Sequence, residues 1–218
     1  FPVVGGGEWV LGLTECRKGG IERLTNNMPA HRVSLSEPAG DSDPAAGTAL
    51  IFSPRLSRAV VDRGCKGSRI AWGQVETDVK GTDVIIIFVY VPHFSRQNPS
   101  AEDTWGDLEL LHQEFEKDPR QRRAVKILMG DFNGRLARAY NFTGTKRPAK
   151  IVEGMAEKTA EVTGCWSVHN QDNEMGTMLR QYLQDHSMVS VGSFFRPVQK
   201  KAGAATYVPF GDYKHRKS

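Results

Sequence analysis

The sequence has few cysteines and no long apolar run, and both absences narrow the kind of protein that it encodes. No stretch approaches the roughly 18 apolar residues of a membrane span, so we expect no membrane partner. Its three cysteines are odd in number and scattered: Cys16, Cys65 and Cys165. They lack the spacing of a structural zinc site and fit a reducing compartment. Residues 1–7 lack the length and basic start of a secretory signal, which also predicts an intracellular protein.

An excess of one charge is nearly absent as well. The chain has 29 Lys and Arg against 25 Asp and Glu, which gives a net charge of +4 and a pI near 9.0. This small positive excess is compatible with a polyanionic partner such as nucleic acid but does not by itself indicate one. With 218 residues, of which 39% are hydrophobic, the chain can bury a sizeable core, and we expect a single domain over residues 1–218.

Short apolar runs predict several strands. Residues 9–13 form one such run, and residues 26–47 are typical of a connection with at most a short strand. Four further strand-like runs are residues 48–53, 58–62, 69–77 and 84–91. The gaps between these four are too short for anything but antiparallel neighbours, which predicts a meander. The last run is apolar at nearly every position and must be covered on both faces.

Two helices are predicted by apolar residues at helical spacing. The first spans residues 101 or 102 to 117, and with the strands before and after it forms a right-handed parallel crossover. The second spans residues 173–186, and its inward side chains are Met178, Leu179, Tyr182 and Leu183. Residues 140–155 are predicted to be a basic loop, and residues 188–195 and 206–208 to be strands.

The stretch AVKILMGDFNG, residues 124–134, organises these elements. Residues 125–129 are typical of a fully buried strand that ends at Gly130. Asp131 and Asn133 follow its C-terminal edge, and Phe132 between them can turn inward to anchor the loop. Because alternate side chains of an extended backbone point the same way, this carboxylate and amide can address one ligand together. Asn133-Gly134 is equally an ordinary turn signal, so the pattern fits either a turn or a site.

Polar groups at three strand ends predict a shared site. Glu15, Tyr90 and the Asp131/Asn133 pair each finish or follow an apolar strand, and parallel strands bring their C-terminal ends to one rim. Carboxylates on such a rim suit Mg²⁺, which binds few protein oxygens and keeps water and phosphate as its other ligands. The alternative is that Glu15 is a solvated loop acid and Tyr90 a core aromatic residue.

Five motifs follow one another in order through essentially the whole chain: Leu13-Thr14-Glu15, Val89-Tyr90-Val91-Pro92, Gly130-Asp131-Phe132-Asn133-Gly134, residues 166–179 and Thr206-Tyr207. In these motifs the sequence resembles the endonuclease/exonuclease/phosphatase family, in particular the apurinic-type endonuclease domain of non-LTR (LINE-type) retrotransposons. The resemblance implies a four-layer α/β sandwich of two packed mixed β-sheets flanked by helices. It also implies a phosphodiesterase that depends on Mg²⁺, or on Mn²⁺ in its place.

The same resemblance implies residue roles and partners. Carried over by motif, these are Glu15 as a metal ligand, Tyr90 as a contact to the scissile phosphate, Asp131 as the group that aligns or activates water, Asn133 as a phosphate ligand, and Thr206 as a residue near the substrate. Ser218 matches the serine ahead of the family's Ser-x-Ile-Asp segment. The implied substrate is duplex DNA, nicked in the nucleus by a protein fused to a reverse transcriptase.

The sequence departs from the family at both ends. The family begins with a strand that carries an active-site Asn and ends with an Ile-Asp segment and an Asp-His pair, and this chain has neither. Asp185-His186 ends a helix in mid-chain and His215 lies in a basic tail, so neither replaces the pair. We therefore expect a domain that is truncated or decayed at both termini, with little activity on its own.

Three functions follow as hypotheses. The first is a Mg²⁺-dependent endonuclease that nicks DNA and leaves a 3′-hydroxyl. The second is an inactive relic that binds nucleic acid, and the third is a small-molecule or lipid phosphodiesterase of the same superfamily. Salt-sensitive phosphate contacts are expected from basic residues of a loop and of the tail, namely Lys146, Arg147, Lys150, Lys200, Lys201, Lys214, Arg216 and Lys217.

Overall fold

The chain forms two compact units, Phe1–Phe132 and Asn133–Ser218. The computed structural model describes residues 7–16, 23, 26–27, 32–36, 47–79, 81–93, 100–137, 140–142, 148–151, 162–164, 167, 169 and 171–193. Within these ranges, no helix has both the length and the apolar character needed to cross a bilayer.

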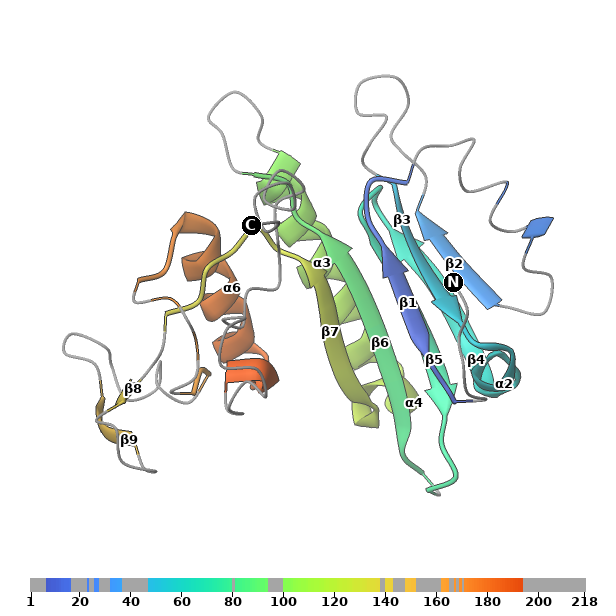
Figure 1. Ribbon diagram of the computed structural model, residues 1–218. Helices are drawn as coiled ribbons and strands as arrows, with labels where there is room; N and C mark the ends of the chain where they lie inside the picture. Colours follow the sequence, from blue (N-terminus) through green and yellow to red (C-terminus); the bar gives the residue numbers. More distant parts are fainter. Residues whose placement is uncertain are drawn as a thin grey trace, which may run out of the picture. The chain divides into compact units, whose positions relative to one another are not determined.

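Two β-sheets make up most of the first unit (Figure 1). One sheet has the strand order β1-β3-β2, from β1 (Val10–Leu13), β2 (Arg32–Ser36) and β3 (Thr48–Phe52). The other has the order β4-β5-β6-β7, from β4 (Val60–Lys66), β5 (Ile70–Glu76), β6 (Asp83–Tyr90) and β7 (Val125–Asp131). The predicted α/β sandwich is confirmed. The four-stranded sheet is mixed, whereas the described pairs of the three-stranded sheet are all antiparallel.

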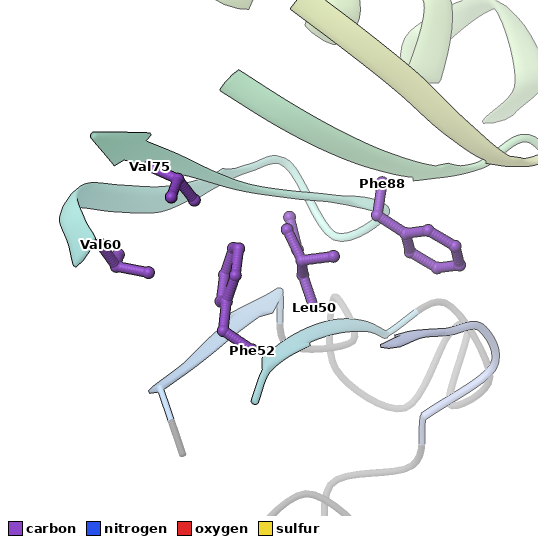
Figure 2. Packing of buried hydrophobic residues seen from close by; sticks show 6 residues of the cluster. Leu50, Phe52, Val60, Val75 and Phe88 are labelled. Carbon is purple, nitrogen blue, oxygen red and sulfur yellow. The ribbon is translucent and has the colours of Figure 1, made fainter. Parts of the chain in front are cut away.

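A hydrophobic core joins the two sheets. Leu50 and Phe52 of β3 point toward Val75 of β5 and Phe88 of β6 (Figure 2). A Cβ atom on Gly12 would overlap the Phe88 ring, and one on Gly73 would overlap the Phe52 ring. Because glycine has no side chain, both aromatic rings can approach the backbone of the opposite sheet closely.

The helix α3 (Ser100–Lys117) covers the other face of the four-stranded sheet (Figure 1). Its Phe115 meets Trp72 of β5 edge to face, with ring centroids 5.0 Å apart. The chain runs from β6 through α3 and the short helix α4 (Pro119–Arg123) to the parallel strand β7, so the predicted helix and parallel crossover are confirmed. Coverage of β6 on both faces explains why its sequence is apolar at nearly every position.

Two expectations for this unit are wrong. The strand β3 does not join the meander, because α2 (Pro54–Ala59) carries the chain from one sheet to the other. Ser53 caps this helical turn and Pro54 begins it, a start that favours a helix over a hairpin. The strand β7 is not fully buried and continues through Gly130 to Asp131. It lies at the edge of its sheet among the described strands, so Val125 and Ile127 are exposed.

The second unit contains α6 (Glu174–Asp185), capped by Asn173 and His186. Its buried side chains include Leu179, Tyr182 and Leu183 as predicted, but also Met175 and Arg180, whereas Met178 is only half-buried. The Arg180 guanidinium binds both Asp172 carboxylate oxygens, at 2.6 and 2.8 Å, and the hydroxyl of Thr163 at 3.0 Å. This pairing accounts for a charged side chain in the interior.

Two further predictions for this unit are corrected. The expected basic loop contains a hairpin of β8 (Tyr140–Phe142) and β9 (Pro148–Ile151). Residues 188–193 contain no strand but a 3₁₀ turn, η2 (Val191–Ser193). There Ser193 donates to the Ser190 carbonyl at 2.6 Å and accepts from the Gly164 amide at 2.7 Å, and such local bonds compete with a strand ladder. The strand expected at residues 206–208 lies outside the described residues.

Candidate active site

Three strands place a row of polar residues at one end of the four-stranded sheet. Tyr90 at the end of β6 pairs in register with Asp131 at the end of β7. On its other side, the Tyr90 amide donates to the carbonyl of Arg69, which directly precedes β5, at 3.0 Å. Residues that oppose one another across paired strands project to the same face of a sheet. Arg69, Tyr90 and Asp131 therefore share one face.

Glu15 reaches this row from the other sheet. It follows β1 with a φ of 56°, in the left-handed region, and the next amide, of Cys16, donates to the Gly47 carbonyl at 2.7 Å. The Tyr90 hydroxyl donates to the Glu15 carboxylate at 3.1 Å. This bond joins the ends of two strands from different sheets, which residue spacing alone does not reveal.

The environment of the Tyr90 hydroxyl raises its pKa to about 12. Burial is the largest cause, followed by the hydrogen bond to Glu15 and the negative charges of Glu15 and Asp131, while the positive charge of Arg69 acts in the opposite direction. Tyr90 thus stays protonated near neutral pH and can donate a hydrogen bond. Both carboxylates act electrostatically on the same hydroxyl, so these three groups form one cluster.

Gly130 and Phe132 position Asp131 between them. Gly130 has a φ of 145°, and a Cβ atom there would overlap the Val89 carbonyl oxygen of the neighbouring strand. Only glycine fits this close approach without strain. The Phe132 ring stacks on Trp105 of α3, with centroids 6.1 Å apart and planes 25° apart, which confirms its predicted anchoring role.

The acidic groups suit a hard divalent cation with few protein ligands. No cluster of three or more His, Cys, Asp or Glu side chains able to hold a metal occurs in the described part of the chain. Mg²⁺ commonly takes only one or two carboxylates and completes its coordination with water and substrate oxygens. Glu15 and Asp131, both exposed, are donors of that kind.

The remaining predicted residues, Asn133, Thr206 and Ser218, lie outside the first unit. Asn133 belongs to the second unit, has a φ of 47°, and its carbonyl accepts from the Asn173 side-chain amide at 3.0 Å. The Asn173 side-chain oxygen accepts from the Arg135 and Gly176 amides, at 2.7 and 2.8 Å. Asn173 therefore ties residues 133–135 to the start of α6. Thr206 and Ser218 lie outside the described residues.

Sequence reasoning missed two residues that shape these sites. Asn173 was recognisable only as the start of a helix, although an asparagine cap has further hydrogen-bonding groups to offer. Arg69 had no signal beyond its place at the start of a predicted strand.

No protein-family model matches this sequence, and the search of curated proteins found no significant match.

Proposed function

We propose that the chain is a Mg²⁺-dependent phosphodiesterase whose site is formed by Glu15, Tyr90 and Asp131. The observation that supports this most directly is the hydrogen bond from the Tyr90 hydroxyl to Glu15, with Asp131 in register on the adjacent strand. A metal-binding carboxylate, a neutral donor and a second carboxylate able to orient water can together serve the hydrolysis of a phosphodiester.

Each side chain has a definite task in this proposal. Glu15 would hold the Mg²⁺, whose bound charge offsets that of the phosphate. The Tyr90 hydroxyl, which is protonated at neutral pH, would then turn from Glu15 to donate to a phosphate oxygen. Asp131 would accept a hydrogen bond from the attacking water and orient it in line with the leaving oxygen.

The order of motifs narrows the proposal to an endonuclease of the LINE retrotransposon type. Such an enzyme nicks duplex DNA and leaves a 3′-hydroxyl, from which the reverse transcriptase fused to it extends. Under this proposal, Asn133 assists in holding the phosphate and Thr206 lies near the substrate. Asn173 also hydrogen-bonds the backbone of Asn133 and Arg135, so the Asn133-Gly134 turn has a structural role whether or not Asn133 binds phosphate.

Conversion of supercoiled plasmid to its nicked form tests the proposal. Protein translated from the complete reading frame is compared with Asp131→Asn, Glu15→Gln and the control Asp78→Asn, which alters an exposed turn residue. We expect Mg²⁺-dependent nicking that EDTA abolishes, a loss of at least about 100-fold in the first two variants, and no change in the control.

The products separate the alternatives. A nicked product that primes DNA polymerase has the expected 3′-hydroxyl. Full activity in Asp131→Asn would refute the mechanism. Binding of DNA without nicking by the wild-type protein would indicate a relic, and hydrolysis of a small phosphodiester alone would indicate a different substrate.

A further inference from the structure

Arg69 is a buried cation at the candidate site. Its accessible surface is only 7% of the fully exposed value. Arginine is almost never buried in this way unless a counter-charge or several hydrogen bonds offset the loss of hydration. We therefore expect neighbouring groups at this end of the sheet to compensate its charge.

The neighbours of Arg69 are the groups of the site. Tyr90 lies directly across from it on β6, and Asp131 continues the same row on β7. Glu15 approaches from the opposite sheet through its hydrogen bond with Tyr90. Arg69, Tyr90 and Asp131 thus project to one face of the sheet, and Glu15 is bonded to the middle residue of this row.

The charges of this cluster do not cancel. Two carboxylates, one guanidinium and one neutral phenol leave about one negative charge at neutral pH, and two without Arg69. A second negative charge would strengthen attraction for a divalent cation. It would also repel the phosphodiester anion.

We infer that Arg69 is a positioning residue of the proposed phosphodiesterase site, where its guanidinium balances the charges of Glu15 and Asp131 beside Tyr90, at the end of the four-stranded sheet. Its effect on hydrolysis rests on the proposed function. The charge balance itself does not, because it concerns the folded chain without substrate.

A double-mutant cycle based on unfolding tests the charge balance and needs no activity assay. Urea unfolding is followed for Arg69→Met, for Glu15→Gln/Asp131→Asn, and for the combination of all three substitutions. Arg55→Met, which removes an exposed arginine that pairs with Glu8, is the control. We expect Arg69→Met to destabilise the wild-type protein more than the variant without the carboxylates. An equal effect in both backgrounds would show that Arg69 only packs, and would overturn the inference.

A variant that does not fold is also informative. If Arg69→Met is unfolded, the inference requires that Arg69→Lys folds and that the triple variant regains its structure. An unfolded triple variant would contradict it, because removing the carboxylates should remove the need for the cation.

Binding of Mn²⁺, followed by electron paramagnetic resonance, and nicking form the second readout. Arg69→Met should bind Mn²⁺ more tightly than wild type and yet nick plasmid about 10- to 100-fold more slowly, while Arg69→Lys recovers most of the rate. Unchanged or weaker Mn²⁺ binding in a folded Arg69→Met protein would contradict the inference. A wild-type protein that neither binds Mn²⁺ nor nicks would instead refute the proposed function, and the unfolding cycle would still decide the role of Arg69.

Discussion

The two ends of β6 carry charged clusters that differ in burial: a buried carboxylate paired with a cation at the start, and exposed carboxylates at the end. At its start, buried Asp83 accepts a hydrogen bond from the Gln74 amide and one from Arg120, each at 2.5 Å, and Arg120 also binds Glu76 at 3.1 Å. At its end, Tyr90 bonds to Glu15, and the exposed carboxylate of Asp131 lies in register on β7.

The pKa shifts at the two ends express this difference. The hydrogen bond from Arg120 is the largest cause that lowers the pKa of Asp83 below its ordinary value of 3.8. Burial and two nearby carboxylates raise the pKa of Tyr90 to about 12. A buried carboxylate with its cation in contact is a stabilising pair, whereas exposed carboxylates that outnumber the cation beside them are available to a ligand. The same strand thus serves stability at one end and, in our proposal, chemistry at the other.

The largest expected effect comes from removing the Tyr90 hydroxyl. Tyr90→Phe should lower the nicking rate by about 100- to 1,000-fold, because a preorganised donor to the phosphate is lost. Its unfolding midpoint in urea should hardly change, because the partner Glu15 is exposed and remains hydrated. If Tyr90→Phe lowers the stability but not the nicking rate, the Tyr90 end of β6 serves only stability, as the Asp83 end does.

Asp83→Ala should produce the reverse pattern. The substitution leaves the buried Gln74 amide without its acceptor, which costs about 1–3 kcal/mol of stability, and nicking should be unaffected. Because the folded pKa of Asp83 is lowered, its contribution is fully present above the unfolded value near 3.8 and is lost as pH falls through the folded pKa. The stability difference between wild type and Asp83→Ala should therefore shrink below about pH 4. A difference that stays constant down to pH 2 would contradict this pairing.

The smallest effect is a shift in titration. Glu15→Gln should lower the pKa of Tyr90 from about 12, because the carboxylate that accepts its hydrogen bond and whose charge opposes its ionisation is gone. The ultraviolet absorbance of tyrosinate measures this shift, and Tyr90→Phe in the same background identifies the residue. An unchanged titration curve would show that the bond between Glu15 and Tyr90 does not persist in solution.

Much of the fold follows from local patterns. The apolar spacing predicted α3 with its correct last residue, Lys117, and a start one or two residues late, and the apolar run 84–91 predicted a strand covered on both faces. The failures arose where neighbouring elements decide the outcome. A single helical turn at α2 differs little in sequence from a hairpin loop, yet it places β3 in the other sheet. Likewise, an apolar strand such as β7 has the same local sequence at a sheet edge as in the centre.

The candidate site divides in the same way. The sequence by itself determined that Glu15, Tyr90 and Asp131 stand at strand ends, because side-chain alternation and glycine or turn signals are local properties of the chain. Only the tertiary structure decided that they meet and that Arg69 joins them. Strand register set the row of Arg69, Tyr90 and Asp131, and the close approach of two sheets across Gly12 and Gly73 brought Glu15 within hydrogen-bonding distance. Register and sheet spacing depend on how distant segments pack, so no window of sequence contains them.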